Sequence, residues 1–187
     1  MQHDHLQNDS FRTFIIYACP LGELANQIEQ YFVASRAIFG PNAAHAYMPH
    51  CTLTGFFHDA AAAIASYIEA VDAALRRARP DQPAQALTID RMELSQDFHG
   101  LVLRGPWLKA VISDFASAAC SPTRRDALRL KDWLHLSLAY GFLPDHQDPL
   151  ANLACKLIDI DAPVAWQLHF YERLGDGSWS SHVGWPL

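Results

Sequence analysis

The sequence predicts an α+β domain of two lobes, built from a strand–helix–strand unit that occurs twice. Two strand-like segments, "FIIYACP" and "GLVLRGP", both end in proline and precede an amphipathic helical pattern. From Pro20 to His50 is 30 positions, and from Pro106 to His135 is 29. Each histidine lies in an apolar run, which a further helix and strand follow. The matching order of elements indicates an internal duplication.

The first unit begins with a predicted strand over residues 11–19, which is rich in β-branched and aromatic residues and which Pro20 should end. Apolar residues at helical spacing predict a helix over 21–37. Residues 47–57 then have strand-forming composition. A second amphipathic helix is expected over 59–79, with its first residue, Asp59, as the N-cap.

The first unit ends with a predicted strand over 86–94. The second unit starts with a predicted strand over 98–105, and Pro106 opens its helix. The strand that carries the second histidine is expected over 133–142. In the following helix, Asp148 and Pro149 are a suitable N-cap and first-turn pair. Two final strands are expected around Gly175-Asp176-Gly177, a hairpin signal.

Composition limits the class of protein. Half of the 187 residues are apolar and 18% are charged, which is typical of a globular domain with a sizeable core over 11–187. Residues 1–10 are polar and lack the apolar segment of a signal peptide, so we expect a flexible leader. No apolar run approaches the ~20 residues that span a membrane. The net charge of −6 argues against a general nucleic-acid binder, but a small anionic substrate is compatible with it.

The cysteines indicate a reducing compartment. They stand far apart with no Cys-x-x-Cys pair, which argues against metal-ribbon and thioredoxin-like sites. Three of the four lie in apolar or helical surroundings, which predicts buried free thiols. We therefore expect a cytoplasmic protein. A monomer is expected separately from this. The four positions are Cys19, Cys51, Cys120 and Cys155.

Two segments, "PHCTLTGFF" and "LHLSLAYGF", place a hydroxyl residue two positions after a histidine. Residues i and i+2 of a strand point to the same side. His50 and Thr52 therefore share a face, as do His135 and Ser137, while the intervening residues point into the lobe cores. If the two strands occupy equivalent places in the repeat, two imidazoles and two hydroxyls converge on one cleft.

Such a set suits cleavage of a phosphodiester. In-line attack needs a base that activates the nucleophile and an acid that protonates the leaving oxygen. Histidine titrates near neutral pH, so one imidazole can be neutral while the other is protonated. Hydroxyls can donate hydrogen bonds to the phosphate oxygens. The sequence does not say which histidine is the acid and which the base.

The two motifs resemble the paired His-x-Thr/Ser motifs of the two-histidine (2H) phosphoesterase superfamily, and the resemblance covers the chain from about residue 11. It implies the two-lobed LigT-like fold, with antiparallel sheets around a central cleft. It also implies metal-independent chemistry with no cofactor. The catalytic histidines of the superfamily match His50 and His135, and its phosphate-binding hydroxyls match Thr52 and Ser137.

The segment "HLSLAYG" is similar to the second motif of the cyclic phosphodiesterase branch, in which a tyrosine matched by Tyr140 belongs to the site. Simple alternation puts Tyr140 on the face opposite His135, so this role requires a bulge or bend after Ser137. The branch implies hydrolysis of nucleoside 2′,3′-cyclic phosphates or of ADP-ribose cyclic phosphate. One alternative is an RNA-processing enzyme, which trims RNA ends or joins them by 2′–5′ ligation, and its partner would be RNA ends. The other is a non-catalytic nucleotide-binding module.

Other residues are weaker candidates for the site. The spacing of His45, His50 and His58 fits no common metal motif, and Ser137 lacks the turn of a nucleophilic serine. A basic run precedes the second motif; such a run is usually a solvated face, and otherwise steers a phosphate toward the cleft. Aromatic residues at the cleft mouth can stack a base, and Trp179 is the candidate. The basic run comprises Arg124, Arg125, Arg129 and Lys131.

Overall fold

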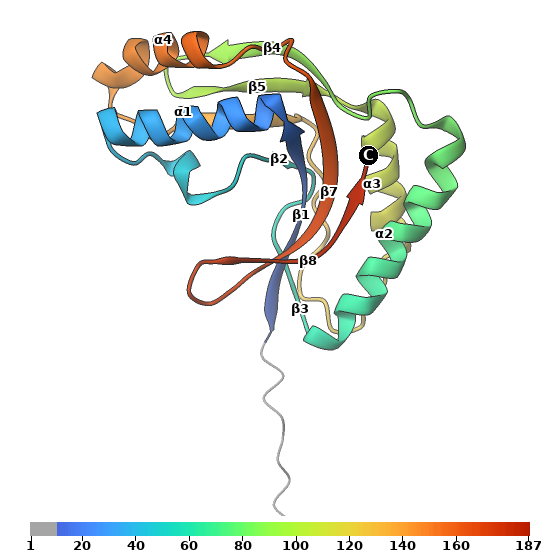
Figure 1. Ribbon diagram of the computed structural model, residues 1–187. Coiled ribbons are helices and arrows are strands. Elements are labelled where there is room, and N and C mark those ends of the chain that lie inside the picture. Colours follow the sequence, from blue (N-terminus) through green and yellow to red (C-terminus); the bar gives the residue numbers. More distant parts are fainter. Residues whose placement is uncertain (1–10) are drawn as a thin grey trace, which may run out of the picture.

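The computed structural model describes residues 11–187, so the expected leader lies outside the described residues. Within this range the chain forms one eight-stranded antiparallel sheet and four α-helices, which confirms the predicted α+β class (Figure 1). The strands are β1 (Arg12–Gly22), β2 (Cys51–Thr52), β3 (Phe57–Asp59), β4 (Thr88–Leu94), β5 (Phe98–Arg104), β6 (His135–Tyr140), β7 (Val164–Arg173) and β8 (Trp179–Pro186). The helices are α1 (Glu23–Phe39), α2 (Ile64–Ala78), α3 (Pro106–Ala118) and α4 (Gln147–Leu157).

The strand order, β4-β5-β6-β2-β1-β7-β8 with β3 beside β1, shows how the two units combine. In each unit, the strand before the helix pairs with the strand that carries the histidine: β1 with β2, and β5 with β6. The last strand of each unit instead pairs with the first strand of the other unit, β4 with β5 and β7 with β1. The halves therefore share one continuous sheet, joined at its centre by β2 and β6.

The helices pack on one face of this sheet. Alternate residues of β1, such as Phe14 and Ile16, join Leu101, Leu136 and Leu168 in one buried cluster with side chains of all four helices. In Figure 1, α1 and α4 lie together on one side of the molecule, and α2 and α3 on the other. The opposite residues of β1 point to the other face of the sheet, which no α-helix of residues 11–187 covers and where the candidate site lies.

The first histidine strand differs from its predicted extent of 47–57. It is split into the two-residue β2 and the short β3, because the chain leaves β1 between them. At the departure point the hydroxyl of Thr54, in place of a backbone carbonyl, accepts the hydrogen bond of the Ile16 amide at 3.1 Å. Thr54 instead forms a bridge to Leu130, which ties this segment to the loop before β6.

Three predicted ends were also wrong. Pro20 does not end β1, which continues to Gly22; β2 pairs with β1 only as far as Ala18, so the missing amide of Pro20 interrupts no bond on that side. Asp59 ends β3 rather than capping α2, which follows a 3-10 turn. Asp148 lies inside the first turn of α4, and His146 occupies the N-cap.

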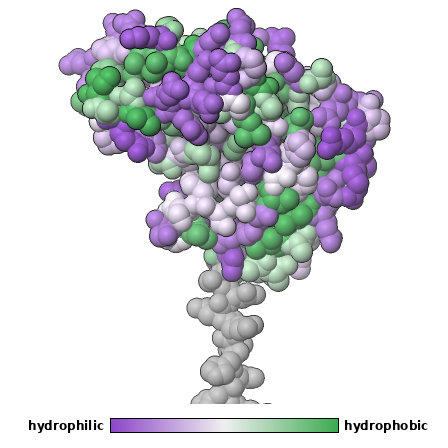
Figure 2. Space-filling model, in the orientation of Figure 1, coloured by the Kyte–Doolittle hydropathy of each residue, from purple (hydrophilic) through white to green (hydrophobic). Residues whose placement is uncertain are grey.

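The surface is mostly hydrophilic on the face shown in Figure 2, with hydrophobic residues in smaller areas among the polar ones. Cys19 and Cys51 are buried free thiols as predicted, whereas Cys120 and Cys155 are free but exposed. Cys120 lies in the loop after α3, and Cys155 lies in α4. Among residues 11–187, no helix has the length and apolar character to cross a membrane.

Candidate active site

The pairing of β2 with β6 brings the two motifs side by side at the centre of the sheet. Cys51 lies opposite Leu136 in this antiparallel pair, so His50 is across from Ser137 and Thr52 is across from His135. The two histidines occupy diagonal positions, which in a sheet are roughly 7–8 Å apart. That separation leaves room for a phosphate group between the two imidazoles.

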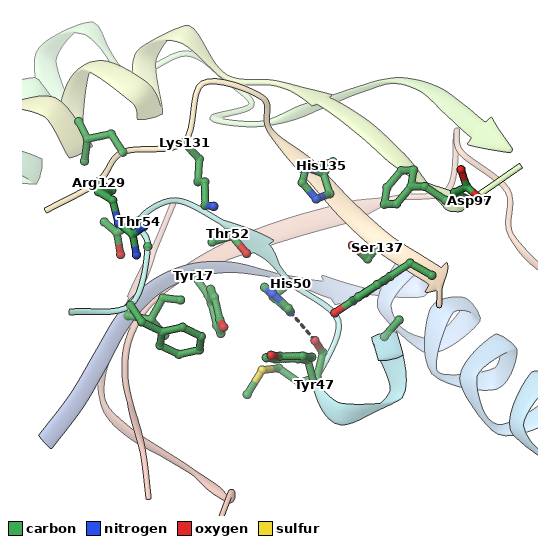
Figure 3. A pocket seen from close by; sticks show the side chains of 18 residues that line it. Tyr17, Tyr47, His50, Thr52, Thr54, Asp97, Arg129, Lys131, His135 and Ser137 are labelled. Atoms are coloured by element: carbon green, nitrogen blue, oxygen red, sulfur yellow. Dashed lines mark hydrogen bonds between the residues drawn. The ribbon is translucent and has the colours of Figure 1, made fainter. Parts of the chain in front are cut away.

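These four side chains line a pocket of about 520 Å³ on the helix-free face (Figure 3). The buried residues between them, Cys51 and Leu136, point into the core as predicted. The hydroxyls of Thr52 and Ser137 make no hydrogen bond to any other described residue, so both are available to a ligand. The pocket is also lined by Ile15, Tyr17, Ala44, Tyr47, Met48, Thr54, Gly55, Phe56, Asp97, Phe98, Arg129, Leu130, Lys131 and Tyr140.

Both histidines are held in the same way. The Nδ1 of His50 donates to the Met48 carbonyl at 2.7 Å, and the Nδ1 of His135 donates, over a longer 3.4 Å, to the Trp133 carbonyl. In each case the acceptor is two residues upstream, so the repeat extends to the orientation of the ring. A carbonyl can only accept, which places the proton of the neutral ring on Nδ1. The Nε2 atoms are then free to exchange protons with a substrate.

The environment favours the neutral form of both imidazoles. Burial lowers the pKa of His50 to about 4; the bond to Met48 opposes this, and nearby His135 adds to it. Burial also lowers the pKa of His135, opposed by the bond to Trp133 and reinforced by the charge of Lys131. An anionic phosphate placed between the rings would raise both pKa values. A bound substrate therefore promotes the protonated state that a general acid needs.

The burial of His50 predicts a loss of stability in mild acid. Its pKa is about 4 in the folded chain and near 6.5 in the unfolded chain, so between these values the unfolded chain binds a proton that the folded chain excludes. The contribution is complete above pH 6.5 and is lost as pH falls toward 4, by up to about 3 kcal/mol. The free energy of unfolding from urea titrations should therefore fall more steeply in the wild type than in His50→Gln. Parallel pH curves for the two proteins would contradict this.

Tyr140 lines the pocket because β6 contains a bulge after Ser137, as its predicted position requires. In the pairing of β5 with β6, Gly100 is opposite Ser137, but His99 is opposite Ala139, so Leu138 is an extra residue on β6. Leu138 and Ala139 are both buried, and the alternation resumes one residue later. Ser137 and Tyr140 therefore line the same pocket. Burial raises the pKa of the Tyr140 phenol, which stays a hydrogen-bond donor.

Gly100 makes room for the aromatic wall beside His135. A side chain at this position would lie 2.4 Å from the ring of Phe98 and 2.6 Å from the carbonyl oxygen of Leu136. Because glycine leaves this space open, Phe98 folds over β5 and lines the pocket. Its ring meets that of His135 edge-on, with 5.3 Å between centroids.

Several lining residues cannot be recognised from the sequence, because strand register brings them to the pocket. Tyr17 lies directly opposite Thr52, so it shares the pocket face, and its ring centroid is 3.9 Å from that of His50. Tyr47 is near the first motif in sequence, but its contact with His50 depends on the 3-10 turn before β2. Arg129 and Lys131 were weighed only as members of a basic run. Arg129 and Lys131 are two positions apart, so on an extended segment they share a side. This spacing is the signal that could have distinguished them from the rest of the basic run.

The remaining histidines of the metal hypothesis have structural partners. His45 bonds to the Asn42 amide and to Ser35, and so caps the 3-10 turn before β2. His58 pairs with Asp126. In the described part of the chain, no three potential ligand side chains are grouped closely enough for a metal ion.

Trp179, the predicted base-stacking residue, does not line the pocket. It stacks on Phe56, which does, with 6.1 Å between ring centroids, and it also packs against Tyr17 and Tyr47. Its place at the start of β8 puts it behind this wall. Trp179 therefore supports the aromatic side of the pocket, and Phe56 and Tyr47 present their rings to it.

The chain was compared with known proteins. No family model matches it. It is 30% identical over 165 residues to ubiquitin-associated and SH3 domain-containing protein B of Mus musculus, covering 87% of this chain and 25% of that protein. It is 27% identical over 199 residues to the ecdysteroid-phosphate phosphatase of Drosophila melanogaster, covering 87% and 26%. The chain thus spans about a quarter of the length of these curated relatives.

Among solved structures, the chain resembles E. coli LigT complexed with ATP, with a TM-score of 0.47 and 14% sequence identity over 95% of this chain and 99% of that chain. The chain's own residues carry the more specific likeness. Both His-x-Thr/Ser motifs are present, and their strands are neighbours with four polar side chains at one pocket. The order of the motifs and the α+β fold agree with what the resemblance of the two motifs to those of the two-histidine phosphoesterases implied.

Proposed function

We propose that this protein hydrolyses cyclic phosphodiesters to phosphomonoesters without a metal ion. The proposed substrates are nucleoside 2′,3′-cyclic phosphates or ADP-ribose 1″,2″-cyclic phosphate. The observation that supports this is the pairing of β2 with β6, which gathers two imidazoles with free Nε2 atoms and two unengaged hydroxyls in one pocket. The pocket volume of about 520 Å³ suits a ligand of nucleotide size.

The reaction needs only these groups and water. One histidine, neutral at Nε2, takes a proton from water as the water oxygen bonds to phosphorus. The bond from phosphorus to one ribose oxygen breaks, and the second histidine, protonated at Nε2, gives its proton to that oxygen. The product is a phosphomonoester with one free ribose hydroxyl. The histidines end with their protons exchanged, and transfer through solvent restores them.

The hydroxyls and the phenol bind the phosphate in this proposal. Thr52 and Ser137 lie beside the two histidines, each across the strand pair from one of them, so they can donate to the non-bridging oxygens from the floor of the pocket. Negative charge on these oxygens is greatest in the transition state, where such bonds are strongest. Tyr140, raised into the pocket by the bulge at Leu138, supplies a third donor.

A panel of phosphate esters tests the proposal. We expect turnover of a 2′,3′-cyclic mononucleotide or of ADP-ribose cyclic phosphate, with the rate unchanged after treatment with EDTA, because the acid, base and donors all come from side chains. Inhibition by EDTA that added divalent metal reverses would contradict the metal-independent mechanism. The panel should be read by phosphorus NMR, which distinguishes the cyclic ester from its monoester product.

The panel also separates the alternatives. Selective turnover of RNA ending in a 2′,3′-cyclic phosphate, or joining of RNA ends, would replace the proposal with an RNA-processing activity. Tight binding of a 2′,3′-cyclic nucleotide without any turnover would indicate a nucleotide-binding module. A simple phosphomonoester belongs in the panel because one relative is named as a phosphatase. Faster turnover of the monoester than of any cyclic ester would also overturn the proposal.

A further inference from the structure

We propose that Arg129 and Lys131 form a second anion subsite, which binds a phosphate that the substrate carries on its 5′ oxygen in addition to the cyclic phosphate. The inference rests on the proposed function and makes it more specific. It favours nucleotides with a 5′-phosphate or 5′-diphosphate over nucleosides that carry the cyclic phosphate alone.

The backbone directs both cations into the pocket. The Gly55 amide donates to the Arg129 carbonyl at 2.7 Å, and the Lys131 amide donates to the Leu53 carbonyl at 3.0 Å. These bonds flank the bridge between Thr54 and Leu130, so the segment before β6 lies against the end of the first motif as a short antiparallel pair. Positions 129 and 131 are two apart on this extended segment and share a side. Both side chains line the pocket.

Neither cation is in direct contact with a carboxylate of the described chain, although the charge of Arg129 acts on Asp126. Across residues 11–187, neither Arg129 nor Lys131 takes part in an ion pair with a carboxylate. The other basic residues of this run have partners elsewhere. Arg124 donates to the carbonyls of Ala119 and Asp126, and Arg125 lies 3.3 Å from the ring centroid of Phe11. The pair of free charges is therefore specific to the two positions that reach the pocket.

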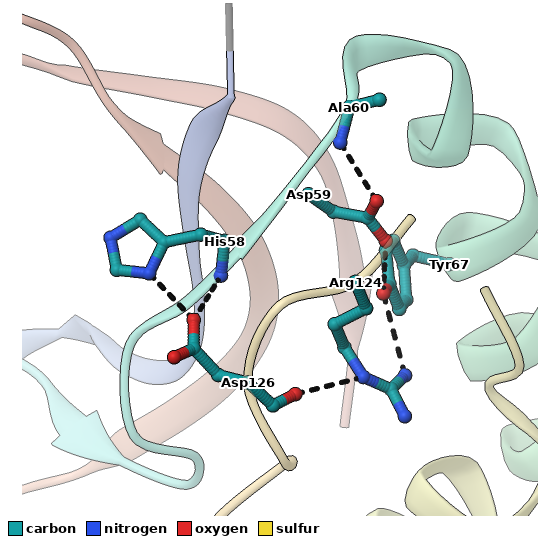
Figure 4. Close-up of polar contacts among 6 residues, drawn as sticks. All are labelled: His58, Asp59, Ala60, Tyr67, Arg124 and Asp126. Atoms are coloured by element: carbon teal, nitrogen blue, oxygen red, sulfur yellow. Dashed lines mark hydrogen bonds and ion pairs between the residues drawn. The ribbon is translucent and has the colours of Figure 1, made fainter. Parts of the chain in front are cut away.

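The loop that carries the two cations is anchored at its other end as well (Figure 4). Asp59 accepts hydrogen bonds from Tyr67, at 2.6 Å, and from Thr123, and it has no exposed surface. Asp126 accepts from both the amide and the ring of His58, at 2.9 and 2.6 Å. With both ends of the loop fixed, the cations are held at the pocket before a ligand binds, which reduces the entropy cost of binding.

The position of the pair indicates which part of the substrate it meets. In Figure 3, Arg129 and Lys131 lie with Thr54 at one end of the pocket, Asp97 lies at the other, and the two histidines lie between them. The charge of Lys131 helps to lower the pKa of His135, so Lys131 is close to the proposed position of the reacting phosphate. The two cations lie on one side of that position and Asp97 lies on the other (Figure 3). A cyclic phosphate at the histidines thus leaves the cations for a second anion.

Charge favours a small nucleotide as the occupant. The whole chain has a net charge of −6, so its surroundings repel a long polyanion, whereas two aimed cations in a pocket can bind one or two phosphate groups. Arg129 offers a forked set of donors that matches two phosphate oxygens, and Lys131 adds a point charge. An RNA strand would need a basic path that continues beyond the pocket.

The test compares adenosine 2′,3′-cyclic phosphate with and without a 5′-phosphate. We expect the wild type to show a higher kcat/KM for the 5′-phosphorylated substrate, mainly through KM. In Arg129→Gln and in Lys131→Gln this preference should fall by roughly 10- to 100-fold, the size expected for hydrogen bonds to charged groups. The preference should also shrink as salt is added. Arg125→Gln is the matched control, because it removes the same charge from the same loop outside the pocket, and should keep the preference.

The possible results distinguish a failure of the subsite from a failure of the proposed function. If the wild type hydrolyses both substrates equally, or if the preference survives in Arg129→Gln and Lys131→Gln, the subsite is wrong while the proposed function stands. If neither substrate is hydrolysed, calorimetry with adenosine 3′,5′-bisphosphate and adenosine 3′-monophosphate tests the subsite alone. Tighter binding of the bisphosphate, lost in Arg129→Gln, supports it, and equal binding overturns it. Preference for a cyclic-ended oligonucleotide over the 5′-phosphorylated mononucleotide would overturn the assignment to a small nucleotide.

Discussion

Replacing either His50 or His135 with alanine should reduce kcat on a hydrolysed cyclic nucleotide by roughly 10²–10⁴-fold, the usual contribution of a general acid or base. Each ring presents a free Nε2 to the pocket. In the proposed reaction each ring transfers one proton, and water is a poor substitute for it in that step. Because both act in one step, the double variant should lose little more activity than either single variant. Initial rates under saturating substrate, measured by phosphorus NMR or a coupled assay, provide the check.

The control for these variants is His169→Ala. His169 lies on β7 and bonds to Gln167 and Ser181, and it does not line the pocket. Its removal changes the same chemical group without touching the proposed machinery, so activity should be kept. His50→Gln, which retains more of the buried volume, guards against loss of folding, as does a thermal unfolding curve. Full activity in either alanine variant would refute the two-histidine mechanism.

The pH dependence of the wild type gives the same variants a second readout. One histidine must be neutral and the other protonated, so kcat/KM should follow a bell-shaped curve. Burial lowers both pKa values in the free enzyme, with that of His50 at about 4, so the maximum should lie on the acid side of 6.5. The alkaline limb is the loss of the proton from the group with the higher pKa. Both limbs should be absent from any residual activity of the double variant.

Removal of the hydroxyls at Thr52 and Ser137 should have the next largest effect. Neither hydroxyl has a protein partner within the described chain, so each is free to donate to a phosphate oxygen. Losing one preorganised donor to a developing negative charge typically costs roughly 10²–10³-fold in kcat. We expect that loss in Thr52→Val, which keeps the shape of the side chain, and in Ser137→Ala.

The conservative variant Thr52→Ser separates donation from packing. It restores the hydroxyl but not the methyl group, so it should recover most of the rate lost in Thr52→Val. A rate in Thr52→Val close to that of the wild type would remove this hydroxyl from the mechanism. Thr54→Ser is the matched comparison, since Thr54 is on the same segment and its hydroxyl is already engaged by the Ile16 amide.

Local sequence patterns predicted much of the fold because they are set by short-range physics. The alternation around His50 and His135, and the apolar stripes of the four helices, depend only on the periods of strands and helices. The distances along the chain from Pro20 to His50 and from Pro106 to His135 are nearly equal, and this predicted two equivalent units. The strand pairing confirms that arrangement. The ends of elements were less predictable. Whether Pro20 ends β1 depends on which neighbouring strand is present at that point, and that is a long-range property.

The sequence alone predicted that the four motif residues share one side of their strands, because a His-x-hydroxyl pattern in a strand places both side chains on the same face. What they face was decided by the tertiary structure. The pairing of β2 with β6 joins segments 85 positions apart, and the bulge at Leu138 turns Tyr140 into the same pocket. The pairing of residues 53–55 with 129–131 likewise separates Arg129 and Lys131 from their basic neighbours. Strand register and bulges arise from the summed packing of distant segments, which no local pattern contains.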